Sequence, residues 1–187
     1  RGHLEAMLLV RPIRRVRLWS RTRESAEAFA RTQAARHGLD IEPAASAREA
    51  VASADIICTV SSAREPILLG DWIAPGTHLN IVGSSLAATA EIDTEAVVKS
   101  RFFVDYRPST ISEGGEYRRA LAAGAITPDH ILGEIGEVAP EPRPDGATAA
   151  TSPSSSRWAS RLRTWPALIT SCERPAPPTS ARRWISS

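Results

Sequence analysis

The chain has 187 residues, which is enough for one domain with a hydrophobic core. Its composition, 42% hydrophobic and 24% charged, is ordinary for a globular protein, and a net charge of +2 argues against nucleic acid or an anionic membrane as a partner. No apolar stretch reaches about 18 residues and no signal peptide is recognisable, so we expect a cytoplasmic protein with no membrane partner. Because the first residue is Arg rather than Met, we also expect a fragment of a longer protein.

The first part of the chain alternates helical and extended patterns. The predicted elements are a helix over 2–10, a strand over 15–19, a helix over 23–38, a short strand over 40–45 and a helix over 46–54. Pro12 ends the first helix and Gly38 the second. Ser46 is a predicted N-cap, and Glu49 follows three residues later as in a capping box.

The alternation continues in the second part. The predicted elements are a strand over 55–60, a loop with a short helical piece over 65–77, a strand over 78–85, a helix over 94–100, a strand over 101–106 and a helix over 115–124. The strands over 55–60 and 78–85 are almost continuously apolar, which is typical of strands covered on both faces. Helices between such strands predict a doubly wound parallel sheet of the Rossmann type.

Cysteine and histidine give no metal or disulfide signal. The residues concerned are Cys58, Cys172, His3, His37, His78 and His130. Two cysteines do not make a disulfide framework, and the histidines lack metal-ligand or catalytic-triad spacing. We interpret Cys58 as a small buried apolar residue and His78 as structural.

The strand over 15–19 ends in a polar sequence, Ser20, Arg21 and Thr22. In a doubly wound sheet, the residue after the second strand meets the adenosine ribose of a bound dinucleotide. An acid there binds the ribose hydroxyls, whereas Arg21 with two neighbouring hydroxyls suits a 2′-phosphate. This predicts NADP(H), with NAD as the other option. The alternative interpretation is an exposed turn in which Thr22 merely caps the next helix.

A glycine-rich phosphate loop is absent from the sequence. In a doubly wound sheet this loop joins the first strand to the first helix. The chain begins inside what looks like that helix, so we expect a partial sheet that lacks the first strand and its loop.

Six blocks in this order carry a family resemblance: "RVRLWSRTRESAEAFA", "ADIICTVSSAREPIL", "WIAPGTHLNIVGSS", "EIDTEAV", "FFVDYRPS" and "ILGEIGEV". Together they resemble the ornithine cyclodeaminase/mu-crystallin family over residues 1 to 138. The resemblance implies a Rossmann-type NAD(P) domain beside a substrate and dimerisation domain, with homodimers among full-length members. Members include ornithine cyclodeaminase, archaeal-type alanine dehydrogenase and ketimine reductases, all of which transfer a hydride between the nicotinamide and an amine or imine carbon.

The resemblance also assigns candidate cofactor residues. Ser20, Arg21 and Thr22 fall at the adenosine ribose, Thr59 and Ser61 border the dinucleotide, and Asn80, Val82 and Gly83 lie against the nicotinamide. For each of these residues, ordinary strand-end packing is the alternative.

One departure from the family pattern separates two chemistries. Cyclodeaminases carry an acid two residues after the glycine that corresponds to Gly83, and this chain has Ser85 there. A serine is a poor general base near neutral pH, so cyclodeamination is disfavoured and the ketimine reductases are the better match. Asp105, Glu134 and Glu137 are expected to brace turns, loops or a dimer contact, and no catalytic residue is assigned.

The composition and the periodicity of the sequence change after residue 138. Residues 139–187 are rich in Pro, Ser and Ala without a period, which predicts a disordered tail. Trp158 and Trp165 are unusual in such a tail. A codon shift of one base would turn the sequence around them into a run such as "T-x-F-K-S-L-G", which resembles the family's ending, so we expect a frameshift between Val138 and Thr151.

These observations predict two regions: a partial NAD(P)-binding domain over 1–138 and an irregular tail over 139–187. The predicted function is NAD(P)H-dependent reduction of a small imine (ketimine), or oxidoreduction of an amino acid, by hydride transfer. As this chain stands, we expect no activity. The alternatives are an ornithine cyclodeaminase, a non-catalytic ligand-binding module and a pseudogene-like product.

Overall fold

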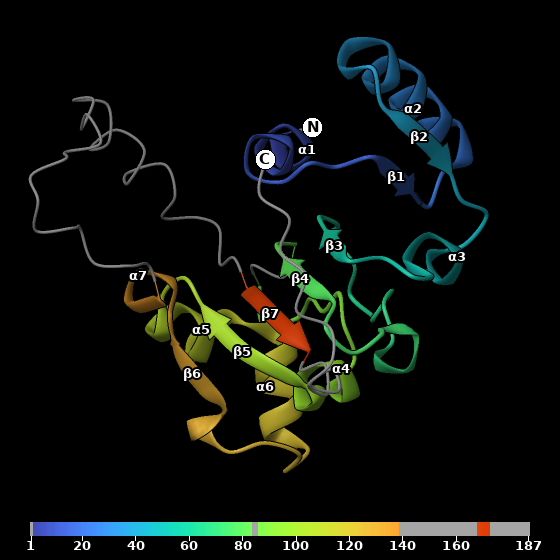
Figure 1. Cartoon of the computed structure of the whole chain (residues 1–187). Helices are drawn as coiled ribbons and strands as arrows, with labels where there is room; N and C mark the ends of the chain where they lie inside the picture. The colour runs from blue at the N-terminus through green and yellow to red at the C-terminus, as the bar shows by residue number, and fades with distance from the viewer. Residues whose placement is uncertain (1, 84–85, 139–167, 173–187) are drawn as a thin grey trace, which may run out of the picture.

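Mostly parallel strands form two sheets in the computed structural model, which describes residues 2–83, 86–138 and 168–172 (Figure 1). The smaller sheet pairs β1 (Arg15–Leu18) with β2 (Asp40–Pro43). The larger sheet has the order β3-β4-β7-β5-β6. Its strands are β3 (Ile56–Thr59), β4 (His78–Ile81), β5 (Ser100–Val104), β6 (Ile131–Glu134) and β7 (Leu168–Cys172).

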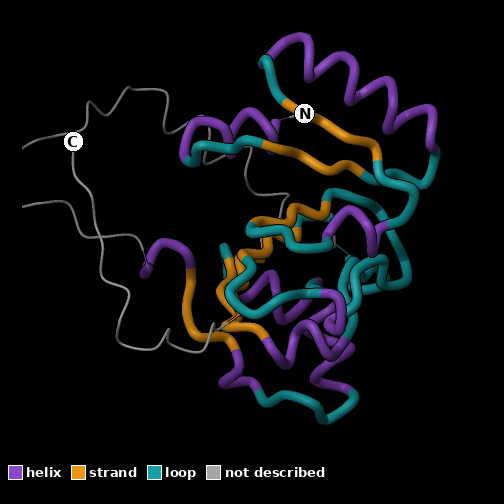
Figure 2. The backbone as a smooth tube through the Cα atoms, turned by 45° about the vertical axis from the view of Figure 1, so that its right-hand side comes forward, coloured by secondary structure: helices purple, strands orange, loops and turns teal. Residues whose placement is uncertain are grey.

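Helices connect and cover these strands, and Figure 2 shows the long second helix lying along the smaller sheet. The helices are α1 (Gly2–Val10), α2 (Arg23–His37), α3 (Ala47–Val51), α4 (Thr94–Lys99), α5 (Arg107–Glu113), α6 (Gly115–Ala122), α7 (Ile135–Val138) and the 3-10 turns η1 (Gly70–Trp72) and η2 (Pro128–His130). None of the helices in the described ranges has the length and apolar character that a bilayer crossing needs.

The helix boundaries follow from local chemistry, as predicted. α1 ends two residues before Pro12, and α2 ends at Gly38, whose φ of 64° lies in the left-handed region that glycine adopts without strain. The Ser46 hydroxyl accepts the backbone N–H of Glu49 at 3.1 Å, while the Glu49 carboxylate accepts the N–H of Ala45 at 2.9 Å. The expected cap at the start of α3 is therefore present.

The strand order confirms the predicted partial doubly wound sheet. In a complete sheet of this type the order is 3-2-1-4-5-6. Here β2 and β1 take the places of strands 3 and 2, and β3 and β4 take the places of strands 4 and 5. No described strand lies between β1 and β3, which is the place of the first strand. The separation into two sheets follows from that open place.

The tail contributes one strand to the larger sheet. β7 runs antiparallel between β4 and β5, with Ser171 opposite His78 and Cys172 opposite Ser100 (Figure 1). The expectation of an irregular tail over 139–187 was therefore too broad at 168–172, because the apolar, β-branched sequence "LITSC" suits a central strand and is too short to show a period. The other residues of the tail, the proposed frameshift included, lie outside the described part of the chain.

The hydrophobic core lies between the larger sheet and helices α4 and α6. Its buried residues are Ile57, Leu68, Leu79, Ile81, Ile92, Ala96, Val97, Phe102, Val104, Tyr117, Ala120, Ile126 and Ile131. The rings of Phe102 and Tyr117 lie 6.1 Å apart, which ties β5 to α6. The predicted burial of both faces of β3 holds fully for one face: Ile57 is buried, whereas Ile56 and Cys58 on the other face are half-buried.

Asp93 joins the start of α4 to the turn η1. Its Oδ1 accepts the backbone N–H of Ala96 and that of Gly70, both at 2.9 Å. Replacing Asp93 with Ala removes a helix cap and a second hydrogen bond, so we expect the free energy of unfolding to fall by about 2 kcal/mol in urea titrations. The control is Asp71→Ala: that side chain is 75% exposed, and we expect a change below about 0.5 kcal/mol. Equal effects of the two substitutions would contradict this role of Asp93.

Candidate functional site: the carboxyl edge of the strands

The loops after β3 and β4 leave the larger sheet at the same edge. The two strands are parallel, with Thr59 opposite Ile81, so Ser61 and Gly83 follow at neighbouring positions. This is the edge at which doubly wound sheets bind their ligands. The structure thus brings together three of the predicted site residues, Thr59, Ser61 and Gly83.

A buried glutamate, Glu91, connects these two loops. Its Oε2 accepts the Thr59 hydroxyl at 2.7 Å and the Gly83 backbone N–H at 2.6 Å, and its Oε1 accepts the Ser61 N–H. The side chain is fully buried. Glu91 was not among the predicted site residues, although an acid between the buried residues Ala90 and Ile92 must find partners, which was a usable signal.

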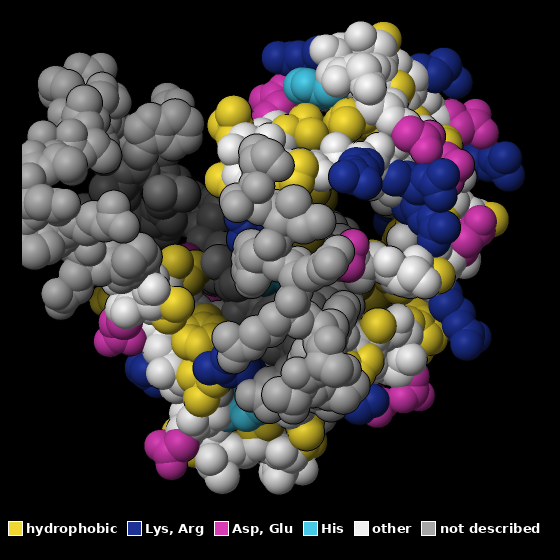
Figure 3. Space-filling view, viewed as in Figure 1, with side chains coloured by type: hydrophobic (Ala, Val, Ile, Leu, Met, Phe, Trp, Pro, Cys, Tyr) yellow, Lys and Arg dark blue, Asp and Glu magenta, His cyan; other side chains and the backbone are white. Residues whose placement is uncertain are grey.

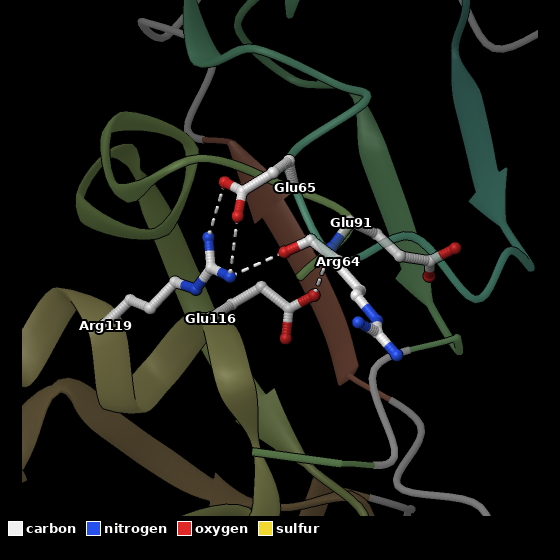
Figure 4. Close-up of polar contacts among 5 residues, drawn as sticks. All are labelled: Arg64, Glu65, Glu91, Glu116 and Arg119. Carbon is white, nitrogen blue, oxygen red and sulfur yellow. Dashed lines mark hydrogen bonds and ion pairs between the residues drawn. The ribbon is translucent and has the colours of Figure 1, made fainter. Parts of the chain in front are cut away.

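The backbone of Glu91 is fixed in turn from α6 (Figure 4). The buried Glu116 accepts the Glu91 N–H at 2.6 Å. One turn further along α6, Arg119 pairs with the carboxylate of Glu65 at 3.1 Å and donates to the carbonyl of Arg64 at 2.5 Å. Helix α6 therefore holds both the loop after β3 and the segment that carries Glu91.

Gly83 is required by close packing. A Cβ built on this residue would lie 1.7 Å from the Ser61 carbonyl oxygen and 2.5 Å from Glu91 Oε1. These distances are far below van der Waals contact, so no other residue fits without moving the backbone. The glycine at the end of β4 lets the two strand-end loops approach each other.

The second polar edge follows β1. Ser20 is half-buried, and Arg21 and Thr22 are exposed. Within the described part of the chain, no hydrogen bond or ion pair engages these three side chains, whereas Arg17 donates to the carbonyl of Ala52 and Arg23 pairs with its helical neighbour Glu27. Thr22 occupies the N-cap position of α2 but makes no side-chain cap bond. The alternative of an exposed turn with Thr22 at the start of the next helix agrees with this position, although the Thr22 hydroxyl makes no cap bond.

This part of the molecule is basic. Between residues 11 and 48 the sequence has nine arginines against four acids. Arginine side chains gather over β1, β2, α2 and α3 (Figure 3). A local excess of positive charge favours an anionic ligand at this edge.

The remaining candidates face the protein itself. The Asn80 amide lies 3.5 Å from Cys58 Sγ and 3.7 Å from Met7 Sδ on α1, and its oxygen lies 3.2 Å from a ring nitrogen of His78. Burial raises the pKa of the Cys58 thiol, although the side chain is half-buried rather than fully buried as predicted. Val82 is buried. Contact of Asn80 or Val82 with a nicotinamide stays a prediction, and Ser85 lies outside the described residues.

The three acids set aside as structural are indeed used in turns. The Asp105 carboxylate accepts the N–H of Tyr106 at 2.8 Å, Glu134 accepts that of Arg107 at 2.8 Å, and Glu137 accepts that of Glu134 at 2.7 Å. Across the described ranges, no group of three or more His, Cys, Asp or Glu side chains is placed to hold a metal ion.

A partial doubly wound sheet with polar and glycine-containing loops at its carboxyl edge defines a Rossmann-type nucleotide-binding domain. The chain belongs to the ornithine cyclodeaminase/mu-crystallin family, whose sequence profile matches residues 1–146. It is 39% identical over 137 residues to ketimine reductase mu-crystallin of Mus musculus, covering 73% of this chain and 40% of that protein. The chain thus spans about two fifths of the length of the curated relatives it matches.

Solved structures agree with this assignment. The Delta(1)-pyrroline-2-carboxylate reductase of Thermococcus litoralis, in complex with NADH and L-proline, matches with a TM-score of 0.71 and 34% identity over 73% of this chain and 42% of that one. The iminosuccinate reductase of Paracoccus denitrificans, in complex with NAD+, matches with a TM-score of 0.66 and 30% identity over 72% of this chain and 41% of that one. Both reductases hold a nicotinamide dinucleotide.

Proposed function

We propose that the protein is an NADP(H)-dependent reductase that converts a small α-imino acid into the corresponding amino acid. The observation that carries this proposal is the edge after β1, where Arg21 and Thr22 are exposed and take no part in the hydrogen bonds and ion pairs among the described residues. Side chains at a ligand-binding edge that make no hydrogen bond or ion pair within the described part of the protein are available to a ligand.

The residues present fit a dinucleotide with a 2′-phosphate. The planar Arg21 guanidinium can donate two hydrogen bonds to a phosphate, and the hydroxyls of Ser20 and Thr22 can donate one each. An acid at this place would bind the ribose hydroxyls of NAD and repel the phosphate, and the sequence has none there. The basic surroundings of β1 favour the same ligand (Figure 3).

The substrate class is proposed from the relatives. Their names specify a ketimine, a pyrroline-2-carboxylate and an iminosuccinate, which share a carbon–nitrogen double bond, in the latter two beside a carboxylate. When bound, NADPH supplies the hydride for the imine carbon, and a proton completes the amine. The loops that contain Ser61 and Gly83 lie at the nicotinamide end of this edge. Ser85 stands where a cyclodeaminase needs an acid, and this favours net reduction over ammonia release. Homodimer formation is proposed from the family resemblance.

The test begins with binding, which needs only the dinucleotide edge. Energy transfer from protein tryptophan to bound NADPH or NADH gives the two dissociation constants. We expect NADPH to bind at least about tenfold more tightly than NADH, which corresponds to the free energy of one charge-assisted hydrogen bond. Because no activity is expected of this chain alone, turnover is then followed in a full-length version that includes a substrate domain, with Δ1-pyrroline-2-carboxylate as substrate, as loss of dihydronicotinamide absorbance. Equal or tighter binding of NADH would overturn the cofactor proposal. In the full-length version, tight NADPH binding without turnover would favour a ligand-binding module, and ammonia release from ornithine a cyclodeaminase.

A further inference from the structure

We infer that Glu91 is the positioning residue of the nicotinamide half of the site: its buried carboxylate sets the distance between the loops after β3 and β4. The inference rests on the proposed function, because it assigns a role at the same dinucleotide edge. Glu91 touches three groups at the ends of the two strands, namely the Thr59 hydroxyl and the backbone N–H groups of Ser61 and Gly83.

All three contacts require an acceptor at position 91. A carboxylate offers only acceptor sites, enough for three donors, whereas an amide would turn an NH₂ group toward one of them. A buried charge is tolerated only when hydrogen bonds replace its hydration, and these three contacts do so at a side chain with no solvent exposure. The chemistry of the partners thus specifies glutamate over glutamine.

The contacts also determine what the edge offers to a ligand. The N–H groups of Ser61 and Gly83 point inward to Glu91 and are used there. They are not available to the cofactor, so these loops act by their position. The two loops lie so close together that Gly83 has no space for a Cβ against the Ser61 carbonyl and the Glu91 carboxylate. The distance between the loops can therefore vary little.

The support of Glu91 comes from outside the edge (Figure 4). Glu116 of α6 accepts the Glu91 N–H at 2.6 Å, and Arg119 of the same helix binds Glu65 and the Arg64 carbonyl. A displacement of α6 would therefore reach the nicotinamide loops through Glu91. The adenosine edge at Ser20–Thr22 belongs to the other sheet, and no hydrogen bond or ion pair among the described residues joins it to this network.

The test compares Glu91→Gln with the wild-type chain for two ligands. NADPH spans both edges, whereas adenosine 2′,5′-bisphosphate reaches only the edge at Arg21. We expect Glu91→Gln to weaken NADPH by about 10- to 100-fold, the range of a lost charge-assisted hydrogen bond, and to change adenosine 2′,5′-bisphosphate by less than about threefold. A general loss of structure would weaken both ligands alike.

Two further variants complete the test. Thr59→Val removes one donor to the same carboxylate, and it should give a smaller effect in the same direction if Glu91→Gln fails to fold. Glu113→Gln, at an exposed position on α5, is the matched control and should leave both dissociation constants unchanged. Wild-type NADPH affinity in both Glu91→Gln and Thr59→Val, or equal weakening of both ligands, would overturn the inference. Failure of the wild-type chain to bind NADPH would overturn the proposed function instead.

Discussion

Replacing Arg21 with Asp is expected to reverse the cofactor preference from NADPH to NADH. The substitution removes the guanidinium that we propose faces the 2′-phosphate and places there a carboxylate, which would repel the phosphate and accept hydrogen bonds from the ribose hydroxyls. Loss of one charge-assisted contact costs about 1.5–3 kcal/mol, and repulsion adds to it. We therefore expect the ratio of the two dissociation constants to change by about 100-fold or more. Titration of both nucleotides by tryptophan energy transfer measures this ratio directly.

Arg23→Asp is the matched control for this experiment. It makes the same change in net charge two residues further on, at an exposed arginine that pairs with Glu27. An acid in the first turn of α2 is favourable for the helix, so the variant should fold. We expect the ratio to change by less than about threefold, because surface charges at a distance are screened. Equal effects of the two substitutions, or indifference to Arg21→Asp, would contradict a phosphate site at Arg21.

Gly83→Ala is expected to produce the largest loss of stability of any single methyl group at this edge. The added carbon would lie 1.7 Å from the Ser61 carbonyl oxygen, so the backbone after β3 or β4 must move. That movement strains the hydrogen bonds that both loops make to the buried Glu91. Overpacking alone costs about 1–3 kcal/mol, and breaking a buried charged hydrogen bond adds a similar amount. We expect the free energy of unfolding to fall by about 3 kcal/mol or more in urea titrations.

Gly136→Ala serves as the control for a glycine with space around it. Nothing lies within 4 Å of a Cβ at Gly136 in α7. Because alanine is the better helix former, this variant should be unchanged or stabilised by up to about 1 kcal/mol. A stable Gly83→Ala variant with normal NADPH affinity would show that the loops after β3 and β4 are not held as close as the structure has them.

Local signals in the sequence predicted most of the elements correctly. Pro12, Gly38 and Ser46 act through backbone geometry or a hydrogen bond a few residues away, so their effect can be inferred without knowing the rest of the fold. The strand pattern and the family resemblance together predicted the partial parallel sheet. These inferences held because each depends on contacts that are near in sequence or on a pattern shared along the whole domain.

The parts that were not predicted depend on distant contacts. β7 inserts between β4 and β5, which precede it by more than sixty residues in sequence. The sequence "LITSC" does not indicate which strands it pairs with. Helix α5 and strand β6 were not assigned, since both are short and depend on neighbours that are distant in sequence: β6 pairs with β5, and 26 residues lie between the two strands. Glu91 was missed because its three partners lie on two different loops, and sequence spacing does not show that they converge.

The same distinction between local signals and distant contacts applies to the candidate site residues. Ser20, Arg21 and Thr22 were predicted from strand order alone, and their contact with an adenosine ribose stays a prediction; the structure adds that no cap bond uses the Thr22 hydroxyl. Thr59 was predicted at the correct edge, but the sequence did not reveal that its hydroxyl is used by Glu91. Position at a sheet edge follows from topology, whereas the direction of a side chain follows from packing.

The most direct test of the account is an NMR titration of the labelled chain with NADP+ and, separately, with NAD+. We expect the backbone amide signals of Ser61 and Gly83 to shift with both nucleotides, because the proposed binding mode places the nicotinamide of each at the carboxyl edge of β3 and β4. The signals of Arg21 and Thr22 should shift strongly with NADP+ and weakly with NAD+, because only NADP+ carries the 2′-phosphate. Identical shifts at Arg21 for the two nucleotides, or shifts that leave out both edges, would contradict the account.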